Sequence, residues 1–171
     1  KDKMSNIPIT ILSSEDVKSP HFDEVVIIKE PKYGFYDKVA HIYLSPYDNT
    51  LFLDTDTYIC DDFSEIFTIL NKFDIAIAHA PVRVTYQIDG IPNSFPEMNT
   101  GVILFKKSHQ TDKLFANWLT FFKEQMEQVV KPSHDQPAFR EALFNRELKI
   151  ATLTPEYNCR FIIPTFISGE V

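Results

Sequence analysis

Residues 50–56, TLFLDTD, decide the fold that the sequence predicts. An apolar run that ends in two aspartates one residue apart is typical of a buried strand that reaches the surface at its end. A carboxylate that leaves such a strand is costly unless a cation or a hydrogen-bond donor meets it. The stretch therefore predicts a core strand with a charged site at its carboxyl end.

The segments on both sides of this strand alternate between strand and helix patterns. Strands are predicted over 7–12, 24–28, 50–56, 74–80, 101–105 and 149–153. Helices are predicted over 34–45, 62–73, 111–129 and 136–146. This alternation predicts an α/β fold of three layers, α/β/α, around a mainly parallel central sheet. The length of 171 residues fits a single domain, 1–171, with a sizeable core.

The predicted strand ends mark the expected position of a ligand site, because ligands of such sheets bind beyond the carboxyl ends of the strands. Asp54 and Asp56 lie at such an end, and Asn99 precedes the 101–105 strand in a loop that reaches it. The stretch 80–98 is rich in proline and predicts a long loop, which in a compact domain is often functional. We therefore expect the site at this edge of the sheet.

The pair Asp54 and Asp56 predicts a metal site. In an extended segment, residues i and i+2 point the same way, so the two carboxylates converge. Two close like charges raise each other's pKa unless a cation neutralises them. Hard oxygen ligands suit Mg²⁺ or Mn²⁺, which would neutralise a substrate diphosphate and stabilise it as a leaving group. The alternative is that Asp54 and Asp56 only cap or end secondary structure.

Two further aspartates, Asp61 and Asp62, follow this pair, and for them the structural role is preferred. Asp62 with Glu65 has the spacing of a capping box for the predicted helix 62–73.

The composition narrows the classes of function. The chain carries 24 acidic and 17 basic residues, a formal charge of −7, which argues against broad nucleic-acid binding. Cys60 and Cys159 lack the spacing of a metal finger and are predicted to be reduced, partly buried thiols. No apolar run approaches the ~18 residues of a membrane span, and the sequence has no basic-then-apolar leader pattern, which leaves open a leader or anchor that has been removed. These features favour a soluble, cytoplasmic domain, although both ends of the sequence start and stop abruptly.

Two other sites also begin with this aspartate spacing. A calcium-binding EF-hand loop needs a third oxygen ligand and then glycine, whereas Tyr58 and Ile59 follow here. A phosphatase of the haloacid dehalogenase type usually continues with glycine and threonine, whereas Thr57 and Tyr58 follow here. The EF-hand is excluded, and the phosphatase stays as an alternative enzyme.

Three segments, in order, resemble a known family. They are FYDKVAHIYLSPYDNTLFLDTDTYI (35–59), FPEMNTGVILFKKS (95–108) and HDQPAF (134–139). This series is similar to GT-A-fold nucleotide-diphospho-sugar transferases of the glycogenin and galactosyltransferase type, that is, glycosyltransferase family 8. The resemblance implies a metal-dependent enzyme that moves a sugar from a nucleotide-diphosphate donor, most often a UDP-sugar, to an acceptor hydroxyl. Mn²⁺ or Mg²⁺ would be the cofactor, and the anomeric configuration would be retained.

The resemblance also implies roles for residues around the first segment. Asp54 would contact the metal and the ribose, and Asp56 the metal. Lys38 stands where such enzymes place a basic residue that faces the donor. For Lys38 the alternative is a solvated flank of an amphipathic helix.

The other two segments would line the sugar pocket. Asn99, Thr100 and Gly101 would contact the sugar, with glycine allowing close approach of the backbone; the alternative is a tight turn into the next strand. Asp135 and Gln136 would lie beside the reacting sugar; the alternative is that Asp135 is the N-cap of a helix.

The sequence departs from the family pattern at both ends. The first strand and nucleobase-binding loop have no counterpart before Ile7, and no histidine after Arg160 matches the usual third metal ligand. His79 and His134 do not fit that position, and His79 is predicted to be structural. The sequence therefore predicts an incomplete domain, and it leaves open a non-catalytic binding module of the same fold.

Overall fold

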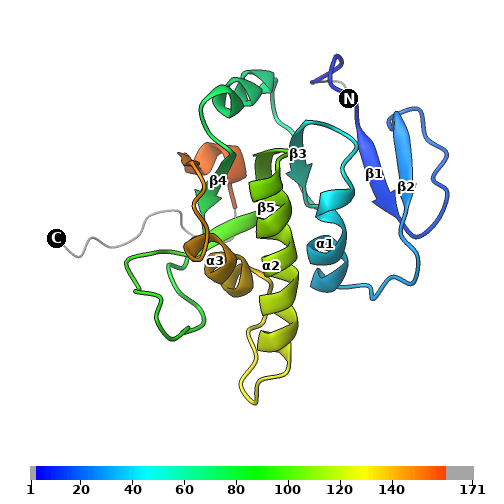
Figure 1. The fold of residues 1–171 in the computed structure, drawn as a ribbon. Coiled ribbons are helices and arrows are strands. Elements are labelled where there is room, and N and C mark those ends of the chain that lie inside the picture. Colours follow the sequence, from blue (N-terminus) through cyan, green and yellow to red (C-terminus); the bar gives the residue numbers. More distant parts are fainter. Residues whose placement is uncertain (1–2, 161–171) are drawn as a thin grey trace.

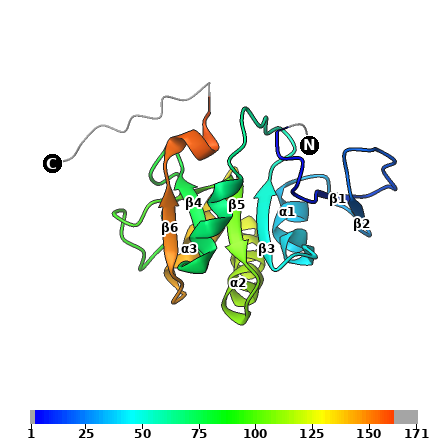
Figure 2. The same cartoon turned by 90° about the horizontal axis from the view of Figure 1, so that it is seen from above.

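A computed structural model describes residues 3–160 and shows two sheets with helices packed on the larger one (Figure 1). The smaller sheet pairs two parallel strands, β1 (Thr10–Ser13) and β2 (Glu24–Ile27). The larger sheet has the order β3-β5-β4-β6, formed by β3 (Asn49–Leu53), β4 (Ile75–His79), β5 (Met98–Lys106) and β6 (Ile150–Leu153). Figure 2 shows these four strands side by side, with β1 and β2 beyond β3. The α/β prediction is confirmed.

The larger sheet is mixed, which corrects the expectation of a mainly parallel sheet. β5 runs antiparallel to both of its neighbours, β3 and β4, while β4 and β6 are parallel. The apolar run 101–105 correctly predicted a buried strand, but such a run carries no information about strand direction. Because β3, β4 and β6 share one direction, their carboxyl ends meet the amino end of β5 at one edge of the sheet.

Helices cover both faces of the larger sheet, as the three-layer prediction requires. The helices α1 (Phe35–His41), α2 (His109–Met126) and α3 (Gln136–Phe144) share one hydrophobic core. On the other face lies a 3₁₀ helix, η2 (Ser64–Asn71), with its own smaller core. Two short 3₁₀ turns, η1 (Ile42–Leu44) and η3 (Pro155–Asn158), complete the described elements.

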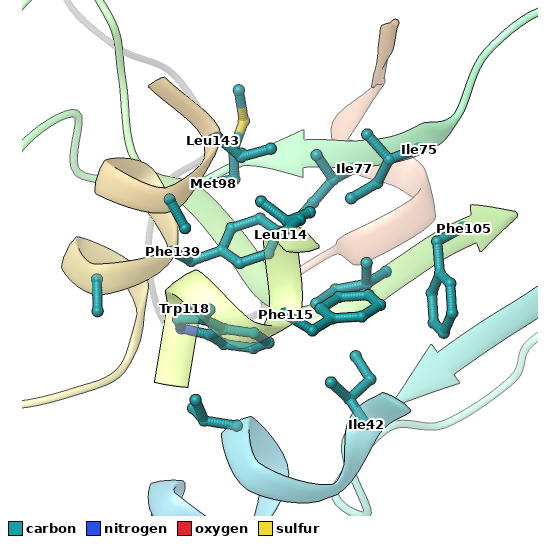
Figure 3. Close-up of a cluster of buried hydrophobic side chains, with 14 of the residues drawn as sticks. Ile42, Ile75, Ile77, Met98, Phe105, Leu114, Phe115, Trp118, Phe139 and Leu143 are labelled. Atoms are coloured by element: carbon teal, nitrogen blue, oxygen red, sulfur yellow. The ribbon is translucent and has the colours of Figure 1, made fainter. Parts of the chain in front are cut away.

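The main core is built around aromatic side chains of α2 and α3 (Figure 3). Trp118 is fully buried and meets Phe139 edge to face, with ring centroids 4.7 Å apart. Phe115 meets Phe105 of β5 in the same way, at 4.8 Å. Edge-to-face pairs of this kind add to the free energy of simple burial. They fix α2 and α3 against the sheet, and with them the start of α3.

Capping explains where α2 begins. Ser108 accepts a hydrogen bond from the backbone N–H of Thr111, and the Thr111 hydroxyl accepts one from the N–H of Ser108. This reciprocal pair satisfies two N–H groups that otherwise lack partners at a helix start. The helix therefore begins at His109, two residues before the predicted start.

The predicted capping box at Asp62 and Glu65 is wrong. Residues 64–71 form a 3₁₀ helix rather than an α-helix, and Asp62 Oδ1 accepts from the N–H of Ser64, two residues on, at 2.8 Å. The Glu65 carboxylate accepts instead from the hydroxyl of Tyr157, at 2.7 Å. A tertiary contact thus replaces the local pairing that the sequence spacing suggested.

No helix within residues 3–160 is long and apolar enough to cross a membrane. The part of the chain after Arg160, where the sequence predicts no metal-binding histidine, lies outside the described residues. Cys60 and Cys159 are free thiols as predicted, but both are exposed, which corrects the expectation that they are partly buried.

The core packing predicts a large loss of stability when Leu114 is replaced by alanine. Leu114 is fully buried in α2, so Leu114→Ala should lower the free energy of unfolding by about 2–5 kcal/mol, the range for such cavities. Chemical denaturation followed by circular dichroism measures this. The exposed neighbour Lys113 is the control, since Lys113→Ala should change the same free energy by less than about 0.5 kcal/mol. Equal effects at the two positions would contradict the described packing.

Candidate functional site

A cleft of about 1230 Å³ opens at the edge of the sheet where the carboxyl ends of β3, β4 and β6 meet the amino end of β5. The positions that the sequence singled out all line it: Lys38, Asp54, Asp56, Asn99, Thr100, Gly101, Asp135 and Gln136. They come from four separate parts of the chain, so the fold alone brings them together. We take this cleft as the candidate site.

Asp54 follows directly from β3. Its backbone N–H donates to the carbonyl of Gly101 at 2.9 Å, so the contact with β5 continues one residue past the strand. The chain then turns, because the N–H of Thr57 donates back to the carbonyl of Asp54 at 3.1 Å. The predicted strand 50–56 therefore ends at Leu53, and Asp56 lies in a turn rather than in an extended segment. The i, i+2 argument for converging carboxylates does not hold, although both aspartates line the cleft.

Lys38 lies at the centre of a polar cluster, and its side chain is only 10% exposed. Its Nζ atom is 3.2 Å from Asp54 Oδ2 and 3.2 Å from Asp135 Oδ2. It also donates to Thr100 Oγ1 at 3.2 Å. The residue is thus not a solvated flank of α1, and its ammonium group joins α1, the end of β3, and the start of α3.

Asp135 occupies the N-cap position of α3 but its side chain does not cap the helix. The carboxylate is 1% exposed and accepts from the hydroxyl of Thr100 at 2.8 Å. The backbone carbonyl of Asp135 accepts from the indole N–H of Trp118 at 3.1 Å. The sequence pattern predicted the start of the helix correctly, but the side chain is directed to Lys38 and Thr100 instead.

Asn99, Thr100 and Gly101 lie within β5, not in a loop ahead of it as expected. Asn99 Oδ1 accepts from the N–H of Gly101 at 3.2 Å. A Cβ atom on residue 101 would stand 3.3 Å from Asp54 Oδ2 and 3.4 Å from Asn99 Oδ1, closer than side chains usually pack. Glycine is therefore needed here for close approach rather than for an unusual backbone angle.

The electrostatic balance of the cluster is negative. Burial raises the pKa of Asp54, Lys38 opposes this shift, and the charges of Asp135 and Asp56 add to it. Two carboxylates, Asp54 and Asp135, share the one ammonium group, and Asp56 is exposed with no hydrogen-bond or ion-pair partner among residues 3–160. An excess of negative charge with a carboxylate open to solvent suits a divalent cation.

The described residues offer few side chains that could bind a metal ion. No group of three or more His, Cys, Asp or Glu side chains within the described residues could hold a metal ion. A divalent cation in the cleft would be bound through one or two carboxylates and completed by phosphates of a substrate, as Mg²⁺ commonly is. Asp54 and Asp56 are the carboxylates available for such an ion.

Other residues of the cleft were missed from the sequence. Asn158, in η3, donates from Nδ2 to the carbonyl of Asn99 at 3.2 Å. It follows β6, so the rule that sites form beyond strand ends could have found it. Thr85 and His134 also line the cleft and lie 3.3 Å apart, between Thr85 Oγ1 and His134 Nε2. His79, at the end of β4, is not among the lining residues, and burial lowers its pKa.

Comparison with solved structures supports this fold. A glycosyltransferase, GlyE from Streptococcus pneumoniae TIGR4, aligns with a TM-score of 0.57 at 19% sequence identity. The alignment covers 81% of this chain and 32% of GlyE, so the chain spans about a third of that protein's length. No curated protein sequence matches the chain.

The fold is therefore that of a glycosyltransferase-like α/β domain. The chain belongs to the nucleotide-diphospho-sugar transferase family, whose model matches residues 48–167. Membership of family 8 and the missing terminal elements remain predictions from the sequence.

The raised pKa of Asp54 predicts a pH-dependent stability. The folded protein binds a proton on the Asp54 carboxylate more tightly than the unfolded chain does. Protonation of Asp54 therefore adds to the free energy of unfolding, and this contribution is fully present below the unfolded pKa, near 3.8. It is lost as the pH rises through the folded pKa. Asp54→Asn removes the charge, so its stability relative to the wild type should increase as the pH rises above about 4.

Urea denaturation in EDTA, from pH 3 to pH 7, measures this difference. Asp48→Asn is the matched control, since Asp48 is exposed just before the opposite end of β3. A stability difference for Asp54→Asn that is constant across this range would contradict the described electrostatics.

Proposed function

We propose that this domain is a metal-dependent glycosyltransferase that binds a nucleotide-diphosphate sugar in the cleft and passes the sugar to an acceptor hydroxyl. The observation that carries the proposal is the cluster of Lys38, Asp54, Thr100 and Asp135 at the sheet edge, in a chain that belongs to the nucleotide-diphospho-sugar transferase family. These residues come from α1, the end of β3, β5 and the start of α3, and their side chains contact one another.

Asp54 and Asp56 would hold Mn²⁺ or Mg²⁺ together with the diphosphate of the donor. A bound divalent cation supplies the positive charge that stabilises a departing diphosphate. Asp56 is suited to this role because it is exposed and unpaired within the described chain. Asp54 is suited because it is fixed to β5 through its backbone and borders the cleft.

The remaining residues would orient the sugar. Lys38 holds the buried Asp135 carboxylate in place, and the hydroxyl of Thr100 donates a hydrogen bond to the same carboxylate. A fixed carboxylate beside the reacting sugar stabilises the positive charge that develops at C1, and it needs no reorganisation during the reaction. Gln136, the first residue of α3, also lines the cleft and would contact the same sugar. Asn99 and Gly101 would form the floor of the pocket.

A UDP-sugar is the donor that the family resemblance favours. A non-catalytic binding module would contain the same cluster, and only turnover separates the two functions. The haloacid dehalogenase alternative finds no support in the family match.

Metal-dependent nucleotide binding tests the proposal. Calorimetric titration of the wild-type chain with UDP and a panel of UDP- and GDP-sugars should show binding in Mn²⁺ and weak or no binding in EDTA. Asp56→Ala should weaken the Mn²⁺-dependent binding by at least about tenfold, since it removes a direct ligand. Asp48→Ala, which removes an exposed aspartate before the other end of β3, should bind as the wild type does.

Each other outcome has a clear meaning. If neither Mn²⁺ nor Mg²⁺ changes the affinity for any nucleotide sugar, the proposal is wrong. Binding without hydrolysis or transfer would identify a binding module. Release of phosphate from simple phosphate esters, with no need for a nucleotide, would identify a phosphatase.

Gly101→Ala tests the close approach in the pocket. The added Cβ atom meets Asp54 Oδ2 at 3.3 Å, so the carboxylate must move by a few tenths of an ångström. We expect Mn²⁺-dependent donor binding to weaken by about tenfold, because small displacements of site groups carry large penalties. The fold should tolerate the change, since the backbone of residue 101 has no positive φ. Unchanged donor affinity in a folded Gly101→Ala protein would contradict this role.

A further inference from the structure

The long loop between β4 and β5, residues 80–97, is held by a buried carboxylate. Glu97 is fully buried, and its side chain accepts from the backbone N–H groups of Thr85 at 2.7 Å and Tyr86 at 3.3 Å. Its backbone also pairs with the first residues of the loop: its carbonyl accepts from the N–H of Ala80 at 2.9 Å, and its N–H donates to the carbonyl of Arg83 at 2.7 Å. A buried carboxylate with this many partners is a fixed point of the structure.

The contact continues from Glu97 to the cleft. The hydroxyl of Thr85 lies 2.9 and 2.8 Å from the two Glu97 carboxylate oxygens, and 3.3 Å from His134 Nε2. A hydroxyl has one proton, and a carboxylate can only accept. The Thr85 proton is therefore donated to Glu97, and His134 must donate from Nε2 to Thr85. The chain of contacts fixes the protonated nitrogen of the imidazole.

This assignment leaves His134 Nδ1 as the free acceptor of a neutral ring. The atom is buried and has no hydrogen-bond partner among the described residues. A buried polar atom without a partner is destabilising, so the ring is held here at the expense of stability. His134 is the residue directly before Asp135 and Gln136, and all three line the cleft.

A second buried charge ties the same loop to the same helix. Arg140, in α3, is fully buried and donates from Nε to the carbonyl of Phe95 at 2.7 Å and from Nη2 to that of Pro92 at 3.0 Å. The carboxylate of Glu97 interacts favourably with this guanidinium, whose pKa is lowered by burial. The loop is thus held to the α3 segment at two places, one of which is the start of the helix at the cleft.

We propose that Glu97 and Thr85 are positioning residues for sugar transfer: through His134 they lock the 80–97 loop to the segment that carries Asp135 and Gln136. This inference rests on the proposed function, because it assigns these residues to the transfer reaction. The locked wall comprises Pro81, Val82, Thr85, His134, Asp135 and Gln136, all of which border the cleft. A loop of this length that moved freely would change the shape of that wall between turnovers.

The test compares two substitutions of Thr85. Thr85→Val keeps the shape of the side chain but removes the hydroxyl, whereas Thr85→Ser keeps the hydroxyl. In Mn²⁺, with the UDP-sugar that the wild type turns over fastest, Thr85→Val should lower kcat by roughly tenfold to a hundredfold through misplacement of Asp135 and Gln136. The dissociation constant of UDP, which does not depend on this wall, should stay that of the wild type. Thr85→Ser should recover most of kcat.

A matched control separates this effect from loss of stability. Thr50 is a buried hydroxyl residue at the far end of β3, where it contacts Ser45 at 2.6 Å. Thr50→Val removes a comparable hydrogen bond outside the cleft and should leave kcat unchanged. If Thr85→Val keeps the kcat of the wild type, or if Thr85→Ser fails to restore it, the positioning role is wrong.

The ¹⁵N chemical shifts of His134 give a readout that is independent of activity. The wild type should show a neutral ring protonated at Nε2 near pH 8, and Thr85→Val should show an exchange-averaged ring. A ring protonated at Nδ1 in the wild type would overturn the proposal. If the wild type turns over no nucleotide sugar, the proposed function and the assignment to transfer both fail, whereas normal turnover in Thr85→Val overturns only the positioning role.

Discussion

The ammonium group of Lys38 is the interaction on which the rest of the cleft depends. It lies 3.2 Å from one carboxylate at the end of β3 and 3.2 Å from another at the start of α3, and it also contacts β5 through Thr100. Removing one partner of a buried ion pair leaves an uncompensated charge, which is far more costly than the pair itself. The cluster therefore tolerates little change at any one of its positions. The sheet and the helical layer of α1 and α3 meet there because one cation satisfies groups from both.

The sheet provides the frame for this cluster. With β5 reversed between β3 and β4, the carboxyl ends of three strands and the amino end of a fourth share one edge. The strands position Asp54, Asn99 and Thr100 at that edge, and the helices α1 and α3, packed on the sheet through the main core, add Lys38 and Asp135. The long loop 80–97 adds the remaining wall, and it too is held by buried charges, Glu97 and Arg140, together with apolar packing of Ile91 and Phe95. The loop is thus tied down, although connecting segments are usually the most variable parts of a chain.

Much of this arrangement was readable from the sequence, and the failures have physical causes. The run LFL predicted β3 and the position of Asp54, because a buried strand must place a charged residue at its end. The direction of β5 was not readable, since an apolar run looks the same in either direction. The local pattern predicted that the Asp135 side chain caps α3. Instead, this side chain contacts Lys38 and Thr100, which are distant in the sequence. Glu97 gave no signal, because nothing local indicates that a glutamate among prolines is fully buried.

Trp118 connects the hydrophobic core to the reactive end of the molecule. Its ring packs among aromatic side chains of the interior, while its indole nitrogen donates to the carbonyl of Asp135. It is also the sole tryptophan of the chain. The tryptophan fluorescence of this domain therefore arises next to Asp135, a member of the polar cluster in the cleft. An emission shift on ligand addition would report on the cleft directly, with no label attached.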